Sequence, residues 1–162
     1  MTPKTNDPDK NPPRLLTPLF GLGKAEVDTI EVLGFELYQQ GRTHEADIIF
    51  GGLIAIDSKR YQGYAGKGAL ALAEERLDEA VTWLSQALER NDTDAAVHAN
   101  LGETLLRLGR FEAAAAELAK ALALDPENKQ PAANRARAIL MGMKMMMNNL
   151  ESEQQPKPDS DK

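Results

Sequence analysis

The sequence predicts an all-helical protein built from three tandem helix pairs. Its clearest feature is a period of 34 residues, and a fixed period of this length is the signature of a repeat architecture. Within each period, apolar residues recur at the three- and four-residue spacing of amphipathic helices. Four columns keep the period: Gly34, Gly68 and Gly102; Ala46, Ala80 and Ala114; Phe50, Leu84 and Leu118; and Asp57, Asn91 and Asp125.

The third repeat shows the two helices of a pair most clearly. Leu101 and Leu105 are four residues apart and a third leucine follows three residues later, so the three share one face of a first helix. Gly109 then breaks the pattern. The second helix ends before Pro126, because the residue that precedes a proline disfavours helical geometry. Asp125 is placed to cap the helix that follows.

The glycine column lies inside the predicted first helices, where a glycine costs about 1 kcal/mol relative to alanine. Close approach of the two helices of a pair would offset this cost. The alanine column at positions 46, 80 and 114 is therefore expected to face the glycines.

These columns resemble the tetratricopeptide repeat, a helix-turn-helix unit of 34 residues. The third unit matches best, and the second and first depart near their ends, where Asp92 and Ser58 replace the family's proline. The matching residues are Gly102, Gly109, Phe111, Ala114, Ala121 and Pro126 in the third unit, Gly68, Ala80, Leu84 and Ala87 in the second, and Gly34, Gly41, Ala46 and Phe50 in the first. The resemblance implies an all-α fold of three units, 27–60, 61–94 and 95–128, stacked as a right-handed superhelix.

The segments outside the repeats are expected to close the two ends of the stack, since a repeat cannot bury its apolar face alone. Residues 129–149 are predicted to form a C-terminal capping helix, and residues 150–162 a disordered tail. Residues 1–26 are predicted to be a flexible N-terminal arm and lid. Residues 1–14 contain four prolines and five charges, without the apolar core of a secretory signal. A cytoplasmic location is therefore expected.

Composition argues against several classes of function. Without cysteine there is no thiol nucleophile, disulfide or cysteine zinc site, and two histidines without partners at ligand spacing predict no metal or catalytic site. We therefore expect no enzyme and no cofactor. Residues 25–128 carry nine basic and nineteen acidic residues, a net charge of −10, which opposes binding to nucleic acid. No apolar run is long enough for membrane insertion.

In the tetratricopeptide family, the first helix of each pair lines a concave peptide-binding groove. Carried over to this chain, the groove is expected to be apolar at its centre, with aromatic rings at one end. Most positions of the carboxylate clamp found in some family members hold unsuitable residues here, so acidic C-termini are not expected as ligands. The alternative for the two aromatic residues is packing under the N-terminal arm. The expected groove residues are Glu31, Phe35, Tyr38, Gln39, Gln62, Ala65, Ala69, Leu72, Ala99, Glu103, Leu106 and Arg107.

A narrower resemblance is to the class II chaperones of bacterial type III secretion, which hold translocator proteins before export. The stretch 33–41, which contains Phe35 and Tyr38, is similar to that family's first repeat helix, and the stretch 45–50 to the helix that follows. The resemblance implies a protein client, a translocator or other export substrate, bound through an extended segment that contains proline and leucine. The alternative is a structural adaptor that joins two proteins without chaperoning either.

Two further features concern possible partners. The arm contains Pro13, Leu15 and Pro18 in the Pro-x-Leu-x-x-Pro form that the chaperone family binds, so it either docks in a groove of this chain or matches by chance. Five of the six methionines lie between Met141 and Met147. Methionine adapts to irregular surfaces, so this cluster either seals the last repeat or contacts a client or a second copy in a homodimer.

Overall fold

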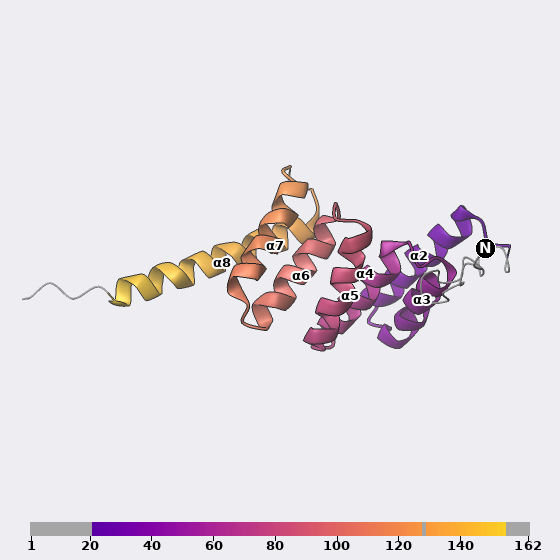
Figure 1. Ribbon diagram of the computed structural model, residues 1–162, viewed down its shortest axis with the longest axis horizontal. Helices are drawn as coiled ribbons and strands as arrows, with labels where there is room; N and C mark the ends of the chain where they lie inside the picture. The colour runs from indigo at the N-terminus through magenta and orange to yellow at the C-terminus, as the bar shows by residue number, and fades with distance from the viewer. Residues whose placement is uncertain (1–20, 128, 155–162) are drawn as a thin grey trace, which may run out of the picture. The chain divides into compact units, whose positions relative to one another are not determined.

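The computed structural model describes residues 21–127 and 129–154, and the elements within these ranges are helices joined by turns and short connections (Figure 1). The predicted all-α fold of helix pairs is therefore confirmed. The chain divides into two compact units after Thr93. The first unit contains α2 (Lys24–Gln39), α3 (Thr43–Ile56), α4 (Tyr61–Ala73) and α5 (Leu77–Arg90). The second contains α6 (Ala95–Arg107), α7 (Phe111–Leu124) and α8 (Pro131–Gln154).

The turn inside each helix pair has the same geometry in all three repeats. Gly41, Glu75 and Gly109 follow the first helix at intervals of 34 residues, and all three have positive φ angles of 74°, 59° and 73°. The next residue in each repeat donates its backbone N–H to a carbonyl five residues earlier, as in the hydrogen bond from Arg110 to Leu105. This bond pattern is that of a Schellman-type helix end, which glycine accommodates without strain.

The glycine column lets the two helices of a pair approach closely. A Cβ added to Gly102 would lie 2.6 Å from Cγ of Leu118, and one added to Gly68 would lie 2.5 Å from Cγ of Leu84. The space beside each glycine is thus filled by the large side chain of the second helix. The expectation that the alanine column faces the glycines is wrong, because the bulkier side chain four residues later reaches this space first.

The core of the first unit surrounds Phe50 of α3. Its ring is fully buried between α2 and α4, where Gly34 and Gly66 leave space for it. Val27, Leu37, Ala46, Leu53 and Leu70 complete this core. The first two repeats therefore share one core, which α3 joins to both first helices.

In the second unit, α8 covers the last helix pair. Ala99 of α6, Leu118 and Ala121 of α7 and Ala136 of α8 are fully buried together. Before α8, the carboxylate of Asp125 accepts hydrogen bonds from the backbone N–H groups of residues 129 and 130, at 3.1 and 2.7 Å. Asp125 therefore holds the connection that precedes Pro131, and does not cap the first turn of α8 as expected.

The two ends differ in extent from the expected segments. The helix α8 continues to Gln154, whereas the capping helix was expected to end at residue 149, and α2 begins at Lys24, inside the expected arm. None of the helices in the described part of the chain has both the length and the hydropathy needed to cross a membrane.

Candidate functional site

The expected groove residues are divided between the two units. Eight lie on α2 or α4 of the first unit, and four lie on α6 of the second. All twelve are thus on first helices of their pairs. The arm motif of Pro13, Leu15 and Pro18 lies outside the described residues.

On α2, the two aromatic groove residues also take part in the core. Phe35 and Tyr38 are partly buried and pack against the core of the first unit. The ring of Phe35 meets Phe50 edge-on, with 5.0 Å between ring centroids. Each ring is therefore fixed by the fold on one side and accessible on another, and neighbouring Gln39 is exposed.

Glu31, one turn before Phe35, belongs to a polar cluster. Arg60, at the start of α4, donates to Asp28 Oδ1 at 2.6 Å and lies 3.6 Å from Glu31 Oε2. Burial raises the pKa of Glu31 above its ordinary value, Arg60 opposes this rise, and Asp28 adds to it. The cluster ties the beginning of α4 to α2 and places negative charge beside the aromatic residues.

On α4, the expected groove residues are small or nearly buried. Ala65, Ala69 and Leu72 keep 7–8% of their surface exposed, and Gln62 is partly buried. The helices α2 and α4 are in contact. The first unit thus combines the aromatic residues of α2 with an alanine-rich face on the neighbouring first helix.

On α6 of the second unit, the expected groove residues differ in what they contact. Ala99 is fully buried in the core, so it supports the helix without presenting a contact surface. Arg107 donates to Glu103 Oε1 at 2.7 Å, so its expected role as a partner for a client's polar group competes with an internal ion pair. Leu106 is partly buried and retains some apolar surface.

Sequence reasoning missed the contribution of α8 to this surface. Arg135 lies 3.2 Å from Glu103 Oε2 and donates a hydrogen bond to Asn100 Oδ1. The available signal was the repeat itself, since Ala136 lies 34 residues after Gly102. The start of α8 therefore occupies the position of a fourth first helix, and its polar residues extend the α6 surface.

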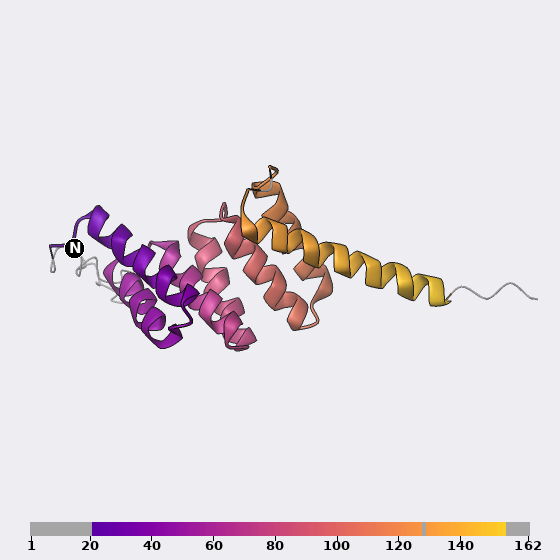
Figure 2. The same cartoon turned by 180° about the vertical axis from the view of Figure 1, so that it is seen from behind.

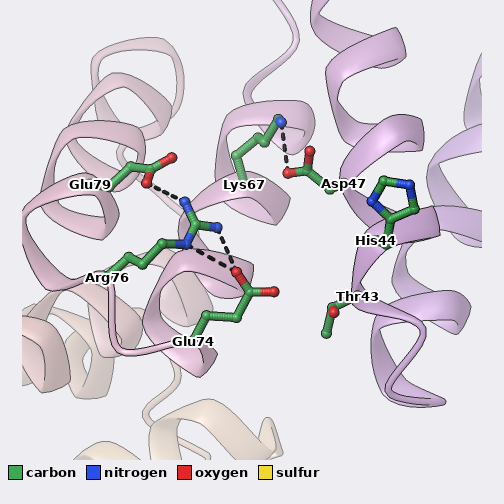
Figure 3. Close-up of a pocket in the computed structure, with 7 residues that line it drawn as sticks. All are labelled: Thr43, His44, Asp47, Lys67, Glu74, Arg76 and Glu79. Atoms are coloured by element: carbon green, nitrogen blue, oxygen red, sulfur yellow. Dashed lines mark hydrogen bonds and ion pairs between the residues drawn. The ribbon is translucent and has the colours of Figure 1, made fainter.

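A separate polar hollow of about 280 Å³ lies in the first unit (Figure 3). Lys67 donates to Asp47 Oδ1 at 2.7 Å, and Arg76 donates to both Glu74 and Glu79. Both cations are thus neutralised by carboxylates on the walls. The remaining lining residues are Thr43 and His44. The sequence did not reveal this hollow, because its charges come from two different repeats.

The other histidine, His98, is buried in the second unit. Its Nδ1 lies 2.6 Å from Glu117 Oε2, and Lys120 donates to the other oxygen of Glu117 at 2.8 Å. Burial tends to raise the pKa of Glu117, but the hydrogen bonds from Lys120 and His98 outweigh it and lower the pKa below its ordinary value. This geometry gives His98 a structural role, because it joins α6 to α7.

Comparisons with known proteins agree with this architecture. Residues 71–140 match the tetratricopeptide repeat family. No curated protein sequence matches the chain significantly.

Solved structures give more extensive matches. A type III secretion complex from Aeromonas hydrophila is 25% identical, with a TM-score of 0.69 over 82% of this chain and 90% of that one. PcrH, known from Pseudomonas aeruginosa, was solved with the chaperone-binding region of PopD; it is 25% identical, with a TM-score of 0.67 over 78% of this chain and 97% of that one.

The Yersinia enterocolitica type III secretion chaperone SycD was solved with a peptide of the translocator YopD. It is 22% identical, with a TM-score of 0.65 over 77% of this chain and 97% of that one. This match concerns the fold. The sequence match over residues 71–140 and the arrangement of the seven described helices both indicate a tetratricopeptide-repeat fold, which this chain shares with the translocator chaperone SycD and with PcrH.

Proposed function

We propose that this protein is a cytoplasmic, non-enzymatic chaperone of type III secretion that captures an extended segment of a translocator containing proline and leucine. The observation that carries this proposal is the combination of Phe35 and Tyr38 on α2 with the adjoining alanine-rich face of α4. It occurs in a fold shared with chaperones that were solved with translocator segments bound.

The chemistry of these helices suits an extended apolar segment. Flat aromatic rings are good surfaces for proline, and an extended proline-containing segment has less conformational entropy to lose on binding. Small residues such as Ala65 and Ala69 let a peptide backbone approach a helix closely. The segment is proposed to pack its proline and leucine side chains against Phe35 and Tyr38 of the first unit. The remaining apolar surface of Leu106, in the second unit, is a separate candidate contact.

The proposal is tested with the chaperone-binding segment of a translocator encoded in the same genome, co-expressed with the full chain. Tyr38→Ala and Leu106→Ala each remove apolar surface from one unit. Each is expected to weaken binding about tenfold, the loss expected for a well-packed contact residue. Isothermal titration calorimetry measures the change, and circular dichroism verifies helicity.

Ile48→Ala is the matched control. Ile48 is 60% exposed on α3, a second helix of its pair, so its removal is expected to leave affinity unchanged. If Tyr38→Ala and Leu106→Ala both bind like the wild type while remaining folded, the proposed binding surface is wrong. If Ile48→Ala is the variant that weakens binding, the client contacts the second helices instead.

A further inference from the structure

The sulfur atoms of the described chain are concentrated on α8. The helices α2 to α7 contain no methionine, and the sequence contains no cysteine. Every methionine of the described residues lies between Met141 and Met147. Thiols and thioethers are the side-chain groups that peroxides oxidise in a two-electron step. Within the described part of the chain, such an oxidant therefore finds its sulfur targets in one short stretch of a single helix.

Four of these five methionines are open to solvent. Met141, Met145, Met146 and Met147 keep 60–67% of their surface exposed. In Figures 1 and 2, the half of α8 that carries them runs beyond α6 and α7. Met143 differs, because it is partly buried and packs against the core of the second unit. The same helix thus carries four accessible thioethers and one that the fold partly covers.

We propose that Met141, Met145, Met146 and Met147 form a reversible oxidation site, which hydrogen peroxide converts to methionine sulfoxide while the helix pairs stay folded. In each reaction a sulfur lone pair attacks one peroxide oxygen. An S–O bond forms as the O–O bond breaks, and the second oxygen leaves as water with both protons. The sulfur loses two electrons, which the peroxide gains.

Reduction completes the cycle. Methionine sulfoxide reductases return each sulfoxide to the thioether, with one enzyme for each sulfoxide epimer. Two thiols supply the electrons and become a disulfide, and the sulfoxide oxygen leaves as water. An exposed position on a helix gives these enzymes access to the sulfoxide without unfolding of the protein.

Oxidation changes the surface of α8 without entering the core. A sulfoxide is polar, so the stretch 141–147 loses most of its exposed apolar character. The four side chains lie outside the buried cluster of the second unit, so their oxidation is expected to change stability little. Oxidation of Met143 would instead place a polar group against that cluster, at a cost in stability. The first helices α2, α4 and α6, to which client capture is assigned above, carry no target for this chemistry.

Peptide mapping of the full-length chain after timed exposure to hydrogen peroxide tests the site. Trypsin cleaves after Arg137 and Lys144, so Met141 and Met143 are compared within one peptide by fragment-ion mass spectrometry. Met141 is expected to oxidise at least about fivefold faster than Met143, and the three methionines after Lys144 at rates like that of Met141. In concentrated guanidinium chloride the rates of Met141 and Met143 are expected to agree within about twofold, because the fold no longer covers either.

The oxidised chain is then compared with the untreated one. Oxidation at the four exposed methionines is expected to lower the midpoint of thermal unfolding by less than about 3 °C. Affinity for the translocator segment is expected to stay within about twofold. Both classes of methionine sulfoxide reductase, supplied with dithiothreitol, are expected to restore the original mass.

A matched variant isolates the partly buried sulfur. Replacing the four exposed methionines together by leucine keeps their volume and their apolar character. This variant is expected to lose the rapid oxidation of residues 138–162 and to keep only the slow reaction at Met143. Prolonged oxidation of the variant is expected to lower its unfolding midpoint more than oxidation of the four exposed methionines lowers that of the wild type.

Four results would overturn the inference: equal oxidation rates of Met141 and Met143 in the folded chain, slow oxidation of all five methionines, unfolding of the chain when the exposed four are oxidised, and sulfoxides that the reductases leave in place. Slow oxidation of all five would show that the end of α8 is covered in solution. Failure of the untreated chain to bind the translocator segment would count against the proposed function alone, so the two proposals can fail independently.

Discussion

The large side chain of the second helix is Phe50 in the first repeat, which lies in the first unit, and Leu118 in the third repeat, which lies in the second unit. The surroundings of these two side chains differ. Phe50 meets glycine on both neighbouring first helices, at Gly34 and Gly66. Leu118 meets Gly102, while the residue sixteen positions later, which corresponds to Gly66, is an exposed asparagine. The ring of Phe50 is larger than the leucine side chain at the equivalent position. It fits because the first helix that follows has a glycine, Gly66, where the third repeat has a residue with a side chain.

The largest expected effect comes from breaking this match in the first unit. In Gly66→Ala the new Cβ would overlap the ring of Phe50, which is buried and cannot move aside. We expect the free energy of unfolding to fall by about 3 kcal/mol, measured by urea denaturation. Adding Phe50→Leu to this variant should recover part of the loss. Gly142→Ala, in open space on α8, is the control. A neutral Gly66→Ala would contradict the volume match.

The second prediction contrasts a partly buried carboxylate in each unit. The pKa of Glu117 is lowered, so its carboxylate stabilises the fold above the ordinary value of 4.5, and this contribution is lost as the pH falls below that value. Glu117→Gln is expected to cost about 2 kcal/mol at pH 7 and progressively less in acid.

The pKa of Glu31 is raised, so ionisation of Glu31 disfavours the folded state as the pH rises through 4.5. Glu31→Gln is therefore expected to stabilise the chain at pH 7, by about 0.5 kcal/mol or less. Urea denaturation from pH 3 to pH 7 measures both variants. Identical pH profiles for Glu117→Gln and the wild type would remove the role assigned to the His98–Glu117 pair.

A further stability prediction concerns the turns inside the pairs. Glu75 adopts the left-handed conformation that Gly41 and Gly109 adopt at the same place. Glu75→Gly should raise the free energy of unfolding by up to about 1 kcal/mol by relieving strain, and Gly109→Ala should lower it by about as much. Thermal unfolding followed by circular dichroism compares them. If both changes act in the same direction, the shared turn geometry does not control stability.

The 34-residue period was sufficient to predict the helix pairs, the turns and the close approach at the glycine column. It did not predict which side chain meets each glycine, because that depends on the length of the side chain and the rotation of each helix. The His98–Glu117 pair and the Arg135 contacts also escaped prediction, since each joins residues far apart in sequence whose charges alone suggest solvent exposure. The polar residues after Leu150 predict a tail, whereas α8 continues through the first of them to Gln154.

Hydrogen exchange on the full-length chain, with and without the bound translocator segment, tests the central proposal most directly. We predict that the bound segment slows exchange of the backbone amides in α2, α4 and α6, the first helices of their pairs. Smaller changes are predicted in α3, α5 and α7. Protection confined to the second helices, or to the C-terminal half of α8, would contradict capture of the client by the first helices.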